Sequence, residues 1–236
     1  MTNLSIFVGI GSLVLLIGIW AIARSIKRKN QLNAQVADLK DFADEKGYLF
    51  SLSDLGSTTW SISSSNWRIW FVADSNNSPP DAHLHLTATN LPPGCDFAVL
   101  CNHADKAARS PASQFMQNMA GSTITYSSTE KGVIPVEFTR EIVSASHSGQ
   151  LGTSEKPYLK AFARNANELS KIVRGSLGGL VDAINANEQR VEFTPYPHIA
   201  KCGSNLEVVA YLRDPGRNEV EALIRIYDAV AGLTKV

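Results

Sequence analysis

Three histidines and a cysteine form the one group in this sequence whose residue types and spacing suggest chemistry. His83 and His85 are two residues apart in a strand-like segment, so both imidazoles would project from the same face of a strand. Cys101 and His103 repeat this spacing at the end of the next predicted strand. If the two strands pair, imidazole nitrogens and a thiolate would converge, and that donor set suits zinc.

The same residues also have an ordinary interpretation, which we prefer. Leu84 and Leu86 alternate with the histidines, and burial of these leucines is reason enough for a strand. Histidines on the solvated face of such a strand need no ligand. We therefore expect no cofactor, and keep zinc held by His83, His85, Cys101 and His103 as the alternative.

No catalytic motif of known spacing accompanies this group. The sequence lacks a P-loop, a dinucleotide-binding fingerprint, a nucleophile elbow and an HExxH zinc motif. Several carboxylates lie in or beside predicted strands, but their positions single out no acid–base pair. They are Asp96, Glu137, Glu141, Glu192 and Glu207. Enzymatic activity is left open by the sequence, which favours a non-enzymatic protein.

Charge and cysteine content exclude two classes of protein. Lys and Arg number 22, as do Asp and Glu, and no basic stripe is visible, so we expect no nucleic-acid partner. The three cysteines are odd in number and include no CxxC pair, which argues against a disulfide framework and agrees with a reducing compartment. Cys202, near a predicted turn, is either a reactive thiol or, as we prefer, a plain loop cysteine.

Short apolar and aromatic runs after residue 47 predict an antiparallel meander, because turn-forming pieces separate them. The expected strands are Tyr48–Leu52, Thr58–Ile62, Trp67–Val72, His83–Thr89 and Phe97–Cys101. Trp60, Trp67, Ile69 and Phe71 are expected to fill one face of this sheet, in preference to stacking on a ligand.

The second half of the chain alternates between strand-like and helix-like patterns. Strands are expected at 122–127, 134–143, 158–164, 191–194 and 206–212, and helices at 111–121, after Asn165 and after Pro215. The polar stretch 144–157 is a candidate lobe boundary. We therefore predict an α+β fold of mostly antiparallel sheet, with its helices concentrated in the C-terminal half.

The N-terminal segment Leu4–Ala23 carries no charge and is followed at once by Arg24, Lys27, Arg28 and Lys29. Twenty helical residues span roughly 30 Å, the thickness of a bilayer core. We therefore predict a transmembrane anchor over residues 1–29, with the lipid bilayer as a partner. The basic flank predicts a single-pass membrane protein whose N-terminus is outside and whose C-terminal domain is cytoplasmic.

Small residues divide between two faces of this predicted helix and would permit close contact with another helix. Ser5, Gly9 and Ser12 share one face, and Gly11, Gly18 and Ala21 share the other. The pattern at residues 30–47 predicts that the helix continues as a juxtamembrane helix and ends at Gly47. Residues 48–236 then form the predicted cytoplasmic domain, which we expect to fold by itself.

These expectations favour a non-enzymatic interaction or scaffold module within a membrane complex. Its predicted partner is another protein, or a second copy of the chain bound through the membrane helix. The alternatives are a membrane-tethered metal-dependent hydrolase and a small-ligand sensor that uses the Trp-rich sheet. The layout is similar to that of uncharacterised single-span bacterial proteins, a likeness that no residue motif supports.

Overall fold

The computed structural model describes most of the chain, in segments. These are residues 2–52, 58–74, 81–101, 134, 138, 141–142, 147–151, 159–175, 177–180, 198–212 and 215–233. On the first helix, side chains are described from Gly18 onward, apart from Arg28. The expected elements at 111–121, 122–127 and 191–194 lie outside the described residues.

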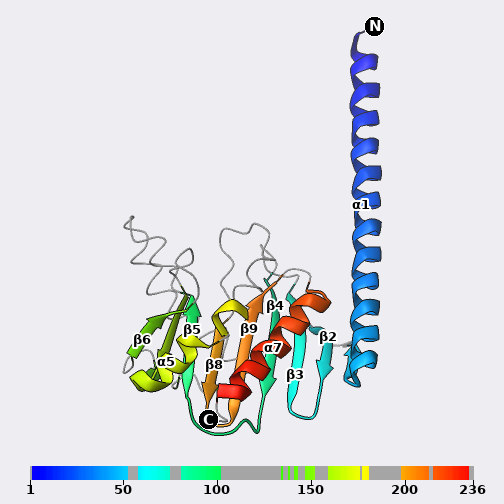
Figure 1. Cartoon of the computed structure of the whole chain (residues 1–236). Coiled ribbons are helices and arrows are strands. Elements are labelled where there is room, and N and C mark those ends of the chain that lie inside the picture. The colour runs from blue at the N-terminus through cyan, green and yellow to red at the C-terminus, as the bar shows by residue number, and fades with distance from the viewer. Residues whose placement is uncertain are drawn as a thin grey trace, which may run out of the picture.

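A nine-stranded sheet, antiparallel throughout, forms the body of the molecule (Figure 1). Its strands are β1 (Leu49–Leu52), β2 (Thr58–Ser63), β3 (Trp67–Asp74), β4 (Asp81–Ala88), β5 (Phe97–Cys101), β6 (His147–Gln150), β7 (Leu159–Ala163), β8 (His198–Cys202) and β9 (Asn205–Tyr211). They lie in the order β1-β2-β3-β4-β9-β8-β5-β7-β6. The first four strands of the predicted meander pair in sequence, but its fifth strand, β5, does not follow β4, because β9 and β8 lie between them.

The helices with described bounds are α1 (Thr2–Lys46), α5 (Ala166–Arg174) and α7 (Arg217–Leu233). Residues 138, 141–142 and 177–180 are also helical, so the strand expected at 134–143 is wrong at residues 138 and 141–142. Helices α5 and α7 lie across the same face of the sheet (Figure 1). The sequence allowed either Asn165 or Asn167 as the cap of this helix, and Asn165 caps α5 by accepting a hydrogen bond of 2.9 Å from the Glu168 backbone N–H. The large antiparallel sheet with helices is the part of the predicted fold class that the structure supports.

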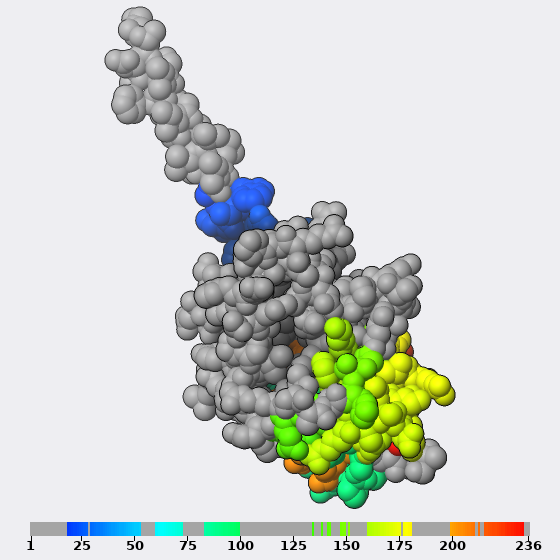
Figure 2. Space-filling view, turned by 90° about the vertical axis from the view of Figure 1, so that its left-hand side faces the viewer, coloured from blue at the N-terminus to red at the C-terminus, as the bar shows by residue number. Residues whose placement is uncertain are grey.

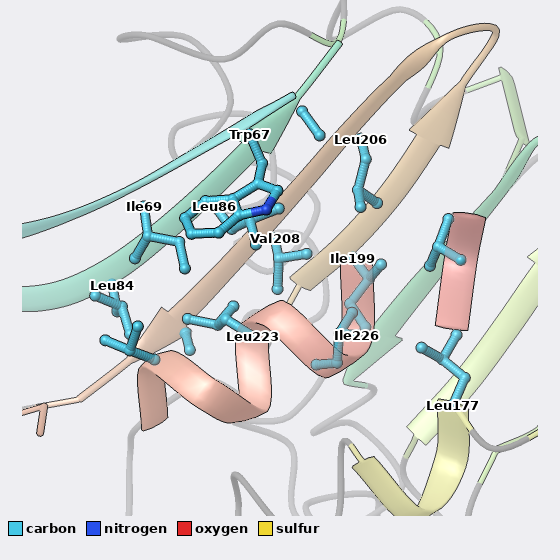
Figure 3. Packing of buried hydrophobic residues seen from close by; sticks show 14 of the residues in the cluster. Trp67, Ile69, Leu84, Leu86, Leu177, Ile199, Leu206, Val208, Leu223 and Ile226 are labelled. Atoms are coloured by element: carbon cyan, nitrogen blue, oxygen red, sulfur yellow. The ribbon is translucent and has the colours of Figure 1, made fainter. Parts of the chain in front are cut away.

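The main core lies between the sheet and its helices because alternate residues of each strand point to that side. Ile69, Leu86 and Val208 face one another across β3, β4 and β9 and are fully buried. Helix α7 covers them with Leu223 and Ile226, which are also fully buried (Figure 3). Each such side chain contributes about 1.5–3 kcal/mol of hydrophobic stabilisation.

The tryptophans of the meander confirm the core-packing prediction. Trp60 and Trp67 belong to the main core together with Ile69 and Phe71. Trp60 stacks on Phe71 at 5.9 Å between ring centroids, and Trp67 meets Tyr48 edge-on at 4.8 Å. Both indoles therefore pack against other side chains of this protein.

The predicted membrane anchor is not supported by the structure of helix α1. Within the described part of the chain, no helix is both long enough and apolar enough to cross a membrane. The described side chains of α1 begin at Gly18, and the cations Arg24, Lys27 and Lys29 lie among them, so the described part of the helix contains only a short uncharged run. This finding overturns the predicted transmembrane helix and, with it, the predicted single-pass location and orientation.

The expected continuity of this helix is confirmed, since α1 runs unbroken to Lys46 and Gly47 ends it with a φ of +69°. Leu39, Phe42 and Ala43 are buried in the main core beside the sheet. A domain that begins at Tyr48 would lack these three side chains. The folded unit therefore includes the C-terminal part of α1.

An arginine of α7 fixes this end of α1. The Arg217 guanidinium donates to Glu45 of α1 at 2.9 Å and to Glu221 of its own helix at 3.2 Å. It also lies over the Phe42 ring, 4.9 Å from the centroid. One side chain thus joins the last turn of α1 to the first turn of α7.

The buried end of α1 can be tested by substitution. We expect Leu39→Ala to lower the free energy of unfolding by about 2–5 kcal/mol, because it opens a cavity in the core. Leu32→Ala, at a position on the same helix that is 37% exposed, should cost less than about 1 kcal/mol. Urea unfolding of both variants measures the difference. Equal losses would show that Leu39 is not a core residue.

Candidate functional site: the exposed face of helix α1

The N-terminal half of the described part of α1 exposes large apolar side chains. Ile19, Trp20, Ile22 and Ile26 have 59%, 62%, 63% and 56% of their surface exposed. Helix α1 stands well clear of the sheet along most of its length (Figure 1). In Figure 2 its described segment, in blue, is separate from the green, yellow and orange surfaces of the body. Monomeric soluble proteins rarely leave contiguous apolar surface of this kind uncovered.

Three isoleucines of this segment form one stripe, which we call the Ile stripe: Ile19, Ile22 and Ile26. Successive helical residues are about 100° apart, so these three side chains point within about 60° of one another. By the same measure the buried face at Leu39 and Phe42 points about 160° away from the stripe. The contacts that hold α1 to its own core therefore leave the Ile stripe uncovered.

Two cations near this stripe lie away from it, whereas Lys29 lies within about 60° of its centre, at the end nearest the body. Arg24 and Lys27 point more than about 100° from its centre. The Arg24 guanidinium lies over the Trp20 ring, 5.1 Å from the centroid, and so covers part of that indole. Between Ile19 and Ile26 the stripe is therefore uncharged, and Lys29 places a charge at its end nearest the body.

The predicted small-residue contacts fall partly within the described region. Gly18 and Ala21 are exposed, and a Cβ added at Gly18 would meet nothing within 4 Å. The side chains of Ser5, Gly9, Gly11 and Ser12 lie outside the described residues. Close approach of another helix along these faces stays a prediction.

His83 and His85 share one face of a strand, as predicted, but the strand that ends at Cys101 does not lie beside theirs. His83 and His85 share a face of β4, with ring centroids 4.5 Å apart, and the Trp70 ring stacks on His85 at 4.9 Å. The zinc hypothesis required β4 to pair with β5. Two strands separate them, which is roughly 14 Å at ordinary strand spacing.

The metal alternative is correspondingly weakened. Cys101 ends β5, and its side chain, like all of His103, lies outside what the structure describes. Within the described residues, no group of three or more His, Cys, Asp and Glu side chains could hold a metal ion. In the described geometry the His85 ring packs against Trp70, and the His83 ring meets His85 edge-on.

A buried lysine, which the sequence analysis missed, closes the end of the sheet near β8. Lys201 is fully buried, and its ammonium donates to the carbonyl oxygens of Gly94 and Gly203, the latter at 2.8 Å. The Gly203 N–H in turn donates to Asp96 at 2.8 Å. Burial lowers the pKa of Lys201, and Asp96 opposes that shift. Lys201 therefore ties two turns together.

The cysteines beside this lysine are not activated. Burial raises the pKa of the Cys95 and Cys202 thiols, so the protonated, unreactive form is favoured. Cys95 also has a φ of +54°, a conformation that the surrounding turn must maintain. This agrees with the interpretation of Cys202 as an ordinary cysteine.

Replacement of the lysine tests this structural role. We expect Lys201→Met to lower the free energy of unfolding by about 2–3 kcal/mol, because two buried carbonyls lose their donor. Lys171→Met, on the exposed side of α5, should change it by less than about 0.5 kcal/mol. Thermal or urea unfolding provides the comparison, and equal effects of the two substitutions would contradict the role.

A buried glutamate occupies the opposite face of the sheet. Glu207 on β9 is 2% exposed, and burial raises its pKa to about 7, although a hydrogen bond from the Ile134 backbone N–H opposes the rise. A small second cluster lies on this face: Ile134, Phe138, Ile142, Ala98 and Ala200. Glu207 therefore holds a backbone segment against the sheet.

The raised pKa makes stability depend on pH. The folded chain binds the Glu207 proton more tightly than the unfolded chain, so this stabilisation is complete below about pH 4.5 and is lost as pH rises through about 7. We expect Glu207→Gln, which keeps an acceptor for Ile134, to gain up to about 3 kcal/mol relative to the parent between pH 4.5 and pH 8. Urea unfolding at both pH values measures this, and a constant difference would contradict it.

Comparison with known proteins gives no further guide to function. No protein-family model, curated protein or solved structure matches this chain. The geometry alone must therefore carry the functional argument. Among the described residues, Leu49 and Leu52 of the edge strand β1 are also exposed, at 71% and 59%, but the Ile stripe is the exposed apolar surface that lies on a helix standing clear of the body.

Proposed function

We propose that this chain is a non-enzymatic protein-interaction module that docks its partner along the projecting part of α1. The observation that carries the proposal is the exposure of 56% to 63% at Ile19, Ile22 and Ile26. Exposed apolar surface of this kind is most economically explained by a binding partner that covers it.

The body of the protein supports this role because it holds α1 rigidly. Leu39, Phe42 and Ala43 are buried in the core, and Arg217 joins the helix end to α7. A helix that is fixed at one end presents its free face in a defined direction, which lowers the entropic cost of binding. The sheet and its helices serve as the support for this docking helix.

The chemistry of the described residues favours a binding role over catalysis. The buried ionisable side chains have structural partners: Lys201 bonds turn carbonyls, and Glu207 bonds the Ile134 backbone. The indoles of Trp60, Trp67 and Trp70 are each at most 8% exposed and contact side chains of the same chain. These contacts support the interaction module over a hydrolase or a ligand sensor.

Photo-crosslinking of the full-length chain in its own cells tests the proposal. A photoreactive residue at Ile22 should form an adduct with another polypeptide, because Ile22 lies at the centre of the docking surface. The matched control is Arg225, an exposed position on α7. Adducts are measured by their shift in gel mobility and by mass spectrometry. Equal adduct formation at both positions, or none at Ile22, would contradict the proposal.

A further inference from the structure

The spacing of the Ile stripe indicates the shape of its partner. Ile19, Ile22 and Ile26 are separated by three and four residues, which is the seam of a two-stranded coiled coil. In the sequence, the same alternation continues toward the N-terminus through Leu15 and Ser12. Helix α1 has regular helical backbone over this stretch, since it begins at Thr2. A second helix is therefore the occupant that fits.

The residues beside the seam indicate which helix this is. In coiled coils, charged residues at the flanking positions select partners of opposite charge. Here the flanking positions hold Ala23, Ser25 and Asn30, none of which is charged. A partner with charged flanks would leave those charges without a counterpart, whereas an identical helix supplies flanks that are equally neutral.

The cations of α1 are compatible with a partner of the same charge. Arg24 and Lys27 point away from the seam, so two copies would not press them together. Lys29 occupies the next seam position toward the body, where its long stem allows the ammonium to reach water. The apolar seam therefore ends before Lys29 and extends from Ile26 toward the N-terminus.

We propose that the Ile stripe of α1 packs against the Ile stripe of a second copy of this chain, forming a two-helix pair. This inference rests on the proposed function and names its partner. The two bodies then lie outside the paired segment, because their cores hold α1 only beyond Val36. The pair is isologous, with the same surface used by both copies.

Co-expression of two full-length copies with different affinity tags tests this directly. Retrieval of one tag should recover the other copy, and light scattering should give about twice the 25.6 kDa chain mass. We expect Ile22→Arg in both copies to weaken association roughly tenfold or more, because it places two charges in an apolar seam. Gln31→Arg, about 150° away on the same helix, should leave retrieval unchanged.

Folding is controlled separately, since both positions are exposed: the melting temperature of the body should be the same in the two variants. Failure of one tag to retrieve the other copy, or equal loss with Gln31→Arg, would overturn the second-copy proposal. If an Ile22 photo-adduct then contains a different protein, docking along α1 stands and only the identity of the partner is wrong. Binding of the parent to phosphatidylcholine vesicles, abolished by Ile22→Arg and without co-retrieval, would overturn both proposals.

Discussion

The arrangement of this protein depends on the burial of one end of a long helix. Leu39, Phe42 and Ala43 pack into the core that the sheet shares with α7, and Arg217 closes the contact through Glu45. Because an α-helix is stiff over this length, fixing its last turns fixes the direction of everything before them. The exposure of Ile19, Ile22 and Ile26 is thus a consequence of the burial of Leu39, Phe42 and Ala43 near the other end of the helix.

This division along one helix separates two kinds of surface. Near the body, apolar side chains point to the chain's own core. Farther along, Ile19, Ile22 and Ile26 point to the other side of the helix, about 160° from the direction of Leu39 and Phe42. A continuous helix cannot bring both faces to the same core, so the second face is left for another molecule. The physical constraint that builds the fold therefore also leaves the docking surface that we propose.

The strands of the meander could be predicted from the sequence because apolar side chains recur at every second residue, and this alternation indicates which face of a strand is buried. Ile69 and Leu86 show this, as does the packing of Trp60 and Trp67. Pairing between distant strands was not predictable, because β9 inserts beside β4 and no local signal specifies that contact. The metal hypothesis required β4 to pair with β5, the next strand in the sequence, and the sheet order does not support that pairing.

The buried ionisable groups and the helix show why other predictions fell short. Lys201 occupies an apolar strand position, but only the fold reveals the Gly94 and Gly203 carbonyls that accept from it. Glu207 was one carboxylate among several until its burial was known. The membrane anchor was predicted from an uncharged run, and the structure finds no described helix with the required length and apolar character.

Amide hydrogen exchange of the full-length chain at several protein concentrations tests the central claim most directly. The account predicts strong protection of Val36–Ala43 at every concentration, since these residues belong to the folded body. It predicts protection of Gly18–Ile26 that increases with concentration, because a second copy covers this segment only after association. Exchange of Gly18–Ile26 that is independent of concentration would contradict it.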